Sequence, residues 1–339
     1  MNSKSKYFKL FAECKLVKGH IRSAIYDLPR ATYKLIPNDL FFILSTFKRH
    51  TIDDIKNNYV ESQHQIIDEY FNMLIDNEFI FFCDEDELEL FVDINTEWDY
   101  PGFISNAIIE LPMQNDTLTS SLLSLEKLGC RFIQFRSFNT LDLNYIEAIL
   151  MFLHNKDFDY VEIISKCGNH DIARINNILQ NNQRLRLFYF YGAEKSVVLK
   201  DMKYERQKIV FSTEMKEKHS DFHVNNKFYF KVNITLYCES VLFNNYYNRK
   251  VCITKEGEIK NCLSLERSFG NVNNFDSIYK IISTDEFQLL WHINHDKIKI
   301  CQDCEFRYMC VDNTPLRYEN GEWIKTSHCF YNPYKPDNF

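Results

Sequence analysis

Three cysteines fall within ten residues of the sequence, in "CQDCEFRYMC" at 301–310. Two residues separate Cys301 from Cys304, and Cys310 follows after five more. A Cys-x2-Cys pair lies on one tight loop, so both sulfurs can bind one centre and backbone N–H groups of the turn can donate to them. The spacing indicates a metal or cluster site rather than a chance grouping of buried thiols.

A centre of this kind needs a fourth ligand, and Cys329 is the best candidate. The 18 residues between Cys310 and Cys329 give the chain room to loop back. Four thiolates suit either a tetrahedral Zn²⁺ or a [4Fe–4S] cluster. The spacing alone does not distinguish these two cofactors.

Three other groups have chemically capable side chains with weaker support. His292 and His295 form a His-x2-His pair without a third ligand, so we expect them to make hydrogen bonds beside the cysteine loop. Arg307 lies inside that loop, where it either balances thiolate charge or faces solvent. Cys167 and His170 follow an expected strand and resemble a nucleophile–base pair, but no third residue orients them.

The charge and the apolar pattern exclude two classes of partner. The net charge is −7 and the pI is near 5.8, so the composition gives no overall case for nucleic-acid binding, which needs a basic surface. The longest apolar runs, such as Tyr145–Leu153, are far shorter than a bilayer span. The first residues lack the apolar core of a signal peptide. We therefore expect a cytoplasmic protein whose 11 cysteines are reduced thiols or metal ligands.

The elements that must position these cysteines fall into three predicted domains. In residues 1–98, β-rich runs precede three helical segments, and a further strand follows them. Asn38 and Thr51 are the expected N-caps of two of these helices. This order predicts a small winged-helix-like domain.

Residues 99–237 alternate between expected strands and helices. Six strands are predicted, at 102–111, 131–138, 159–166, 184–192, 208–213 and 228–237. Such alternation predicts an α/β fold with parallel pairing and helices outside. Six strands indicate a partial (β/α) barrel, because a closed one needs eight.

Residues 238–339 have weak periodicity and many cysteines. Seven of the 11 lie here: Cys238, Cys252, Cys262, Cys301, Cys304, Cys310 and Cys329. A loop-rich, cysteine-dense segment in a reducing compartment usually needs a metal to fold.

The cysteine pattern resembles the SPASM domain, the cluster-binding tail of many radical S-adenosylmethionine peptide maturases. "GEIKNC" (257–262) matches the family's Gly-x4-Cys, and Cys301, Cys304, Cys310 and Cys329 match later positions. The resemblance implies that these four cysteines bind an outer cluster. Cys262 would belong to an inner cluster, and it is a candidate further ligand here.

The chain departs from the family at several places. The first cysteine of the family pattern is missing, because Cys238 lies too far upstream of Gly257 and Cys252 too close. Thr314 stands where the Cys-x3-Cys partner of Cys310 is expected, so we expect one cluster rather than two. The loop after the first barrel strand, at 109–120, lacks the Cys-x3-Cys-x2-Cys motif that binds the radical cluster. We therefore expect no S-adenosylmethionine cofactor and no radical chemistry by this chain alone.

This combination resembles the SPASM-domain peptide maturases of bacterial grasp-with-spasm systems, which modify ribosomally synthesised peptides. The resemblance implies two partners, a precursor peptide and an ATP-grasp ligase. The 1–98 domain would then recognise the leader peptide by strand addition. Two alternatives remain open: a cluster-dependent redox enzyme acting on the peptide, and a zinc-stabilised adaptor.

Overall fold

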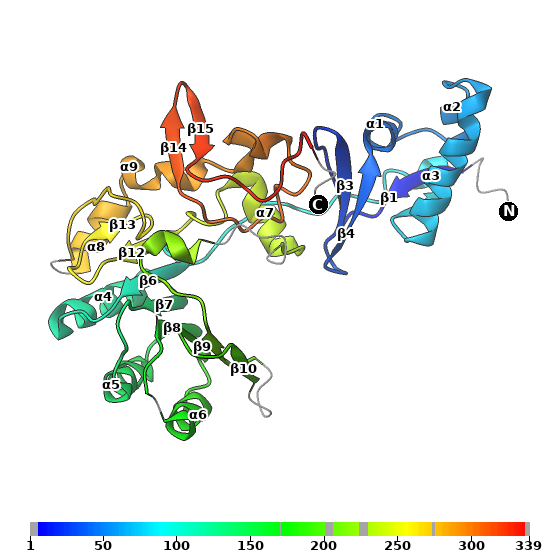
Figure 1. The fold of residues 1–339 in the computed structure, drawn as a ribbon. Coiled ribbons are helices and arrows are strands. Elements are labelled where there is room, and N and C mark those ends of the chain that lie inside the picture. The colour runs from blue at the N-terminus through cyan, green and yellow to red at the C-terminus, as the bar shows by residue number, and fades with distance from the viewer. Residues whose placement is uncertain (1–5, 170, 201–205, 224–229, 273–274, 336–339) are drawn as a thin grey trace.

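The computed structural model describes residues 6–169, 171–200, 206–223, 230–272 and 275–335. The ribbon in Figure 1 places the N-terminal elements beside the C-terminal cysteine region, with the large central sheet below the latter. His170 and residues 228–229 of the last expected strand lie outside the described residues.

The N-terminal part has the predicted order of strands, three helices and a final strand. Its elements are β1 (Tyr7–Leu10), β2 (Cys14–Val17), β3 (Arg22–Asp27), β4 (Thr32–Pro37), α1 (Asn38–Thr46), α2 (Ile52–Lys56), α3 (His64–Asp76) and β5 (Ile80–Cys83). Strands β2, β3 and β4 form an antiparallel sheet, and β1 pairs with β5 in a separate one.

One of the two expected helix caps is confirmed and the other is wrong. Thr51 caps α2 through a reciprocal capping box with Asp54. Helix α1 instead has Pro37 at its N-cap, with no side-chain cap. Asn38 accepts a hydrogen bond from Ser23 Oγ at 2.6 Å and donates to His20 O at 2.9 Å, so its side chain fastens β3 and the preceding turn.

The central sheet has eight strands and is mostly parallel, as the alternation predicts. Its strand order is β10-β11-β9-β8-β7-β6-β12-β13, with β10 and β13 antiparallel at the ends. The elements are β6 (Asn106–Glu110), α4 (Asn115–Lys127), β7 (Phe132–Arg136), α5 (Leu143–Leu153), β8 (Tyr160–Lys166), α6 (Ile172–Asn181), β9 (Leu185–Tyr191), β10 (Val197–Lys200), β11 (Lys208–Ser212), α7 (Ile234–Leu242), β12 (Lys250–Ile253) and β13 (Ile259–Lys260).

The sixth parallel strand is not the one expected from the sequence. The run at 228–237 is rich in aromatic and β-branched residues, yet from residue 234 onward it forms α7. Asn233 caps this helix by accepting a hydrogen bond from Leu236 N at 2.9 Å, so the cap overrides the strand propensity. β12, which pairs with β6, supplies the sixth parallel strand, and the sheet thus extends beyond residue 237.

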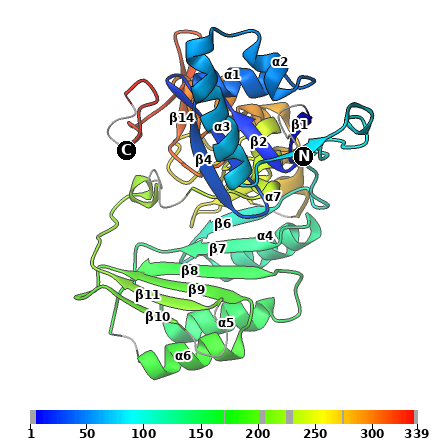
Figure 2. The ribbon, with the colours of Figure 1, turned by 90° about the vertical axis from the view of Figure 1, so that its right-hand side faces the viewer.

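The two faces of this sheet are covered differently. Helices α4, α5 and α6 lie together on one face, as Figures 1 and 2 show. Ile109, Ile133 and Ile163 enter the large apolar core with these helices. Alternate residues point to the opposite face of a strand, and there the chain places Asn106, Gln134 and Glu162.

The C-terminal region is irregular, as predicted from its weak periodicity. It contains α8 (Phe275–Ile282), α9 (Asp285–Gln288), short 3₁₀ turns including η7 (His295–Lys297) and η8 (Cys301–Asp303), and a hairpin of β14 (Leu316–Glu319) and β15 (Glu322–Lys325).

Candidate metal centre

The cysteine loop begins with a tight, unusual turn. Ile300, directly before Cys301, has a φ of +71°, a conformation that β-branched residues rarely adopt. Cys301 opens the short turn η8, and Cys304 N donates to Cys301 O at 3.0 Å. The surrounding structure must hold this strained backbone, which presents both thiols on one loop.

All four predicted ligands come into one neighbourhood. Burial raises the pKa of Cys301 and Cys304, raises that of Cys310 to about 12, and raises that of Cys329. The thiols also raise each other's pKa, because Cys329 acts on Cys301, and Cys301 acts on both Cys304 and Cys310. The chain between Cys310 and Cys329 forms the β14–β15 hairpin, and Cys329 lies beside the loop again after it.

The donor set fits a metal or cluster bound by thiolates. Phe306 N donates to Cys304 Sγ at 3.4 Å, and Tyr331 N donates to Cys329 Sγ at 3.4 Å. Such N–H···S bonds stabilise the negative charge of ligating sulfurs, as the loop spacing predicts. Within the described residues, no three Cys, His, Asp or Glu side chains already surround one point as ligands of a single ion.

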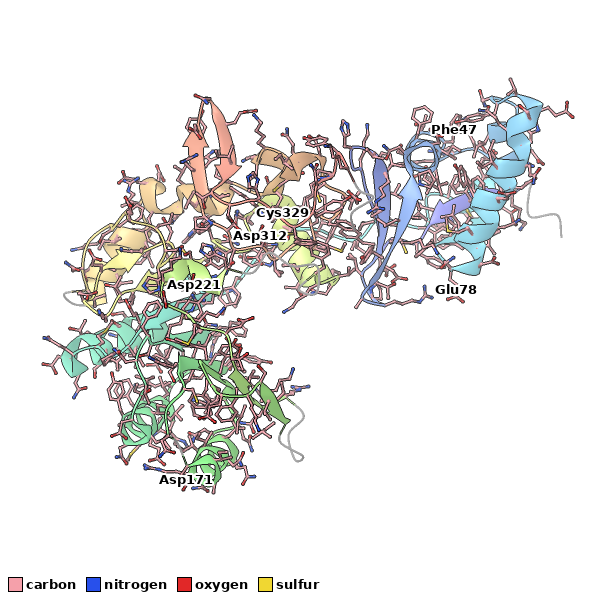
Figure 3. The ribbon with its side chains drawn as sticks, in the orientation of Figure 1. Phe47, Glu78, Asp171, Asp221, Asp312 and Cys329 are labelled. Carbon is pink, nitrogen blue, oxygen red and sulfur yellow. The ribbon has the colours of Figure 1, made fainter. Side chains whose placement is uncertain are left out.

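A buried ion pair stands beside the thiols. Lys325, at the end of β15, lies 2.5 Å from Asp312, and their side chains are only 9% and 2% exposed. Burial alone would lower the pKa of Lys325, but the charges of Cys301, Cys310 and Asp312 raise it above its usual value. Figure 3 labels Asp312 and Cys329 in this region, between the C-terminal hairpin and the N-terminal sheet.

The cation beside the thiols is therefore Lys325, whereas Arg307 serves another purpose. Arg307 pairs with Asp296 at 2.7 Å and donates to the carbonyls of Lys18 and Cys304. It thus ties the cysteine loop to neighbouring segments, and neither role predicted for it describes this arrangement.

The two histidines before the loop do not share one environment. His292 is exposed, whereas His295 is buried. Burial and, to a smaller extent, the charge of Lys325 lower the pKa of His295 to about 3. Its Nδ1 has no hydrogen-bond partner among the described residues. His295 therefore lies close to the ion pair as a neutral ring.

The N-terminal sheet is fastened to the cysteine loop through Glu305. This buried carboxylate accepts hydrogen bonds from Arg22 Nε at 2.7 Å and Tyr331 Oη at 2.5 Å. Tyr26 Oη donates to the Glu305 carbonyl at 2.6 Å. At Gly19 an added Cβ would lie 2.9 Å from Glu305 Cβ and 2.3 Å from Arg22 O, so only glycine permits this approach.

Cys262 lies in a different environment from the four clustered cysteines. Its thiol contacts Ser264 Oγ at 3.1 Å and Tyr246 Oη at 3.3 Å. Burial would raise its pKa, but hydrogen bonds with His223, Ser264 and Tyr246 lower it to about 6. Of the pair considered as a nucleophile and its base, Cys167 is half-buried just after β8, and His170 lies outside the described residues.

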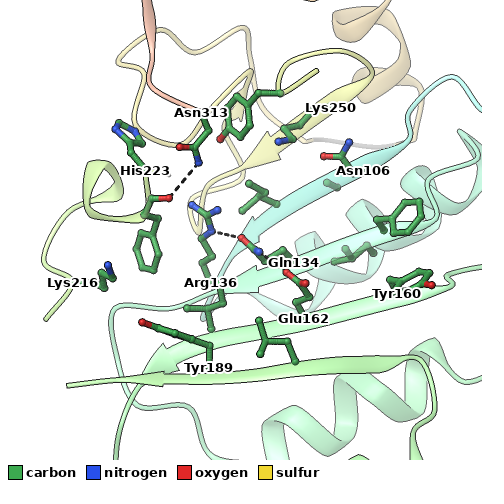
Figure 4. Close-up of a pocket in the computed structure, with 18 of the residues that line it drawn as sticks. Asn106, Gln134, Arg136, Tyr160, Glu162, Tyr189, Lys216, His223, Lys250 and Asn313 are labelled. Carbon is green, nitrogen blue, oxygen red and sulfur yellow. Dashed lines mark hydrogen bonds between the residues drawn. The ribbon is translucent and has the colours of Figure 1, made fainter. Parts of the chain in front are cut away.

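A large cavity covers the face of the central sheet opposite α4, α5 and α6. Its volume is about 730 Å³, a size typical of ligand sites. Strands β6 to β9 form its floor, while residues 214–223, Tyr246, Lys250 and Asn313 form its walls (Figure 4). His223 and Tyr246 connect this cavity to Cys262.

The Lys325–Asp312 pair, the Glu305 contacts and this cavity were not predicted from the sequence. The cavity had a readable signal, because "IQFR" at 133–136 alternates apolar and polar residues. A parallel strand covered on both faces would be apolar throughout, so Gln134 and Arg136 indicate an open face. The two side-chain pairings join residues 13 and 283 positions apart and leave no local signal.

Comparisons with known proteins assign no family to this chain, so a function can be inferred only from the fold and from these sites. No protein-family model matches the chain, and no curated protein matches its sequence. Among the described residues, no helix combines the length and the apolar character needed to cross a bilayer.

Proposed function

We propose that this chain takes part in the maturation of a ribosomally synthesised peptide, together with an ATP-grasp ligase. It would do so as a SPASM-like protein with a degenerate radical S-adenosylmethionine core. The observation that carries the proposal is that Cys301, Cys304, Cys310 and Cys329 lie in one neighbourhood of the C-terminal region, where their thiols raise one another's pKa.

The cofactor we assign to these cysteines is one [4Fe–4S] cluster. Four thiolates, two of them with backbone N–H donors, would hold its irons. When bound, such a cluster supplies either a rigid cross-link or an electron store. The chain's own contribution is to keep the loop fixed against the N-terminal sheet through Glu305.

The central sheet supports a core related to that of radical enzymes without their reaction. Five parallel strands, β6 to β9 and β11, resemble part of a (β/α) barrel, with β12 beside them. The segment between β6 and α4 contains no cysteine. We therefore assign no S-adenosylmethionine to the cavity, and the ligase would make the new bond.

The winged-helix-like N-terminal part would bind the precursor peptide. β2 and β4 are the edges of its three-stranded sheet, and no further described strand pairs with either. Edge strands carry unpaired backbone groups, which an extended leader peptide can use. The leader would then lie close to the cysteine loop, because β3 contacts Glu305 through Arg22.

Metal analysis of anaerobically purified protein tests the cofactor. We expect about four irons and four acid-labile sulfides per chain, lost in Cys304→Ala. Cys130→Ala, a buried cysteine before β7, should retain them and is the matched control. One zinc without sulfide would overturn the cluster and favour a zinc-stabilised adaptor.

Incubation with the precursor peptide tests the partners. The peptide mass should change only when this protein, the ligase and ATP are all present. A mass change with this protein alone would show that it is itself an enzyme. A change with the ligase alone, at an undiminished rate, would refute the proposed role.

A further inference from the structure

The floor of the large cavity carries polar side chains at one level of the sheet. Gln134 on β7 donates to Glu162 on β8 at 2.6 Å, and Arg136 Nε donates to Gln134 at 2.5 Å. Figure 4 shows this row, with the Arg136 side chain rising from it toward Asn313 and His223. The end of the cavity at Arg136 is thus cationic. The carboxylate of Glu162 lies lower on the floor, where it accepts the hydrogen bond from Gln134.

Two buried cations face this end of the cavity. Arg136 and Lys250 are each only 8% exposed, and both line the cavity. The Arg136 guanidinium lies 4.8 Å from the Phe222 ring centroid, and Lys250 Nζ lies 3.4 Å from that of Tyr246. Aromatic rings therefore fix both groups in place.

Neither cation has a carboxylate partner among the described residues. No carboxylate lies within ion-pair distance of either group there. The terminal nitrogens of Arg136 and the Lys250 ammonium also lack a protein acceptor within the described ranges. Buried charges are normally paired, so these donors are left available to something that enters the cavity.

The electrostatics of the neighbouring groups agree with excess positive charge. Burial and, to a smaller extent, Arg136 lower the pKa of Lys250, Cys252, Cys262 and Glu239 raise it, and the resulting pKa is about 8. Burial also lowers the pKa of His219 to about 4, and Arg136 is the next largest cause. An anion bound between Arg136 and Lys250 would relieve both effects.

The other charged groups around the cavity already have partners. Lys216 pairs with Glu214 at 2.9 Å. Asp221 accepts from the backbone N–H groups of Glu217 and Lys218. Glu162 accepts from Gln134. Arg136 and Lys250 are therefore the groups that select the ligand.

We propose that Arg136 and Lys250 bind the carboxylate of an acidic side chain on a peptide lying across the sheet. The identification of the ligand as a peptide rests on the proposed function, whereas the anion site itself does not. A guanidinium binds carboxylates through two parallel hydrogen bonds, and the ammonium adds a point charge. The aromatic rings of Phe132, Tyr160 and Tyr189 on the floor offer apolar contacts for the rest of the peptide.

Saturation-transfer NMR on the full chain tests the site with two short probes. These are acetyl-Gly-Glu-Gly-amide and its glutamine counterpart, compared at pH 7. We expect the glutamate probe to bind about tenfold more tightly. Arg136→Gln and Lys250→Met should each remove this preference. Lys216→Met, which changes a paired lysine of the same cavity, should keep it, with thermal melting confirming that every variant is folded.

The outcomes separate the site from the proposed function. Equal binding of both probes, or a preference that survives in both variants, would overturn the carboxylate site. Inorganic phosphate that displaces the glutamate probe at lower concentration would also overturn it, in favour of a phosphate ligand. Carboxylate binding without any ligase-dependent change in the precursor would uphold the site and refute the proposed function.

Discussion

Two buried lysines show how differently the cysteine centre and the sheet cavity treat charge. Lys325 lies 2.5 Å from Asp312 and beside two thiols, which raise its pKa. Lys250 lies over an aromatic ring, with Arg136 nearby and no carboxylate in contact among the described residues. Burial and Arg136 lower its pKa to about 8.

The difference indicates in which of the two regions the protein itself supplies a partner for the buried lysine. In the cysteine centre, the acid and the base satisfy each other, so only the thiols remain to bind something. In the cavity, no carboxylate of the described residues pairs with the two bases, which agrees with the proposed anionic ligand. The same substitution, lysine to methionine, should therefore have opposite effects on stability in the two places.

The largest effect is expected for Lys325→Met. Removing one partner leaves Asp312 buried and unpaired, so the free energy of unfolding should fall by about 3–5 kcal/mol. Urea unfolding at pH 7 measures it. The double variant Lys325→Met/Asp312→Asn should lose clearly less, and an equal loss in both would show that the pair is not the cause.

Glu305→Gln should have the next largest effect, because it weakens the contact between the cysteine loop and the N-terminal sheet. Glutamine keeps one oxygen but loses the charge that binds Arg22, so we expect a loss of about 2 kcal/mol. Glu322→Gln is the control. Its pair with Lys299 is about half exposed, and its loss should be below about 0.5 kcal/mol. Equal losses would contradict the assigned role of Glu305.

The sequence predicted the parts of this fold that depend on local pattern. The alternation over 102–213 predicted parallel strands with helices between them, and β6 to β9 and β11 confirm it. The strand predicted at 228–237 was wrong, because the side chain of Asn233 caps a helix that begins at Ile234. Likewise, nothing local indicates that β12 pairs with β6, since 139 residues lie between the end of β6 at Glu110 and the start of β12 at Lys250.

The candidate site was predictable only where its residues are close in sequence. The Cys301–Cys310 spacing predicted one centre, and Cys329 joins the same neighbourhood. The charges that distinguish the centre from the cavity were not predictable, because whether a lysine is paired depends on side chains brought together by the tertiary fold. Lys250 and Lys325 look alike in sequence.

Lys250→Met should stabilise the protein, in contrast to Lys325→Met. The lowered pKa of Lys250 means that its charge is unfavourable in the folded state, by on the order of 3 kcal/mol. Methionine keeps the apolar contacts but loses the cation–π contact with Tyr246, worth about 1 kcal/mol. We expect a net gain of about 1–2 kcal/mol at pH 7 in urea unfolding. A loss would mean that Lys250 already has a partner.

The gain should depend on pH in a defined direction. Below pH 8 Lys250 is charged in both the folded and unfolded states, so its penalty is complete. Between pH 8 and about 10.5 the unfolded state binds more protons, so the stability of the wild type rises relative to the variant. The advantage of Lys250→Met should therefore vanish near the upper end of this range. The groups that act on Lys250 are Arg136, Glu239, Cys252 and Cys262, with Tyr246 beneath it. An advantage that stays constant from pH 7 to 10 would contradict the lowered pKa.

The smallest effect is expected for the pH dependence of Cys262 alkylation. Hydrogen bonds with His223, Ser264 and Tyr246 lower its pKa to about 6, so it is already a thiolate at pH 7. Its slow reaction with iodoacetamide should change less than about twofold between pH 7 and 8.5. Cys167, whose pKa is raised by burial, should react up to about thirtyfold faster over the same interval. Mass spectrometry of the two tryptic peptides measures both rates in one sample. A steep rise for Cys262 would show that its thiol is neutral, and the negative charge by which Cys262 raises the pKa of Lys250 would then be absent as well.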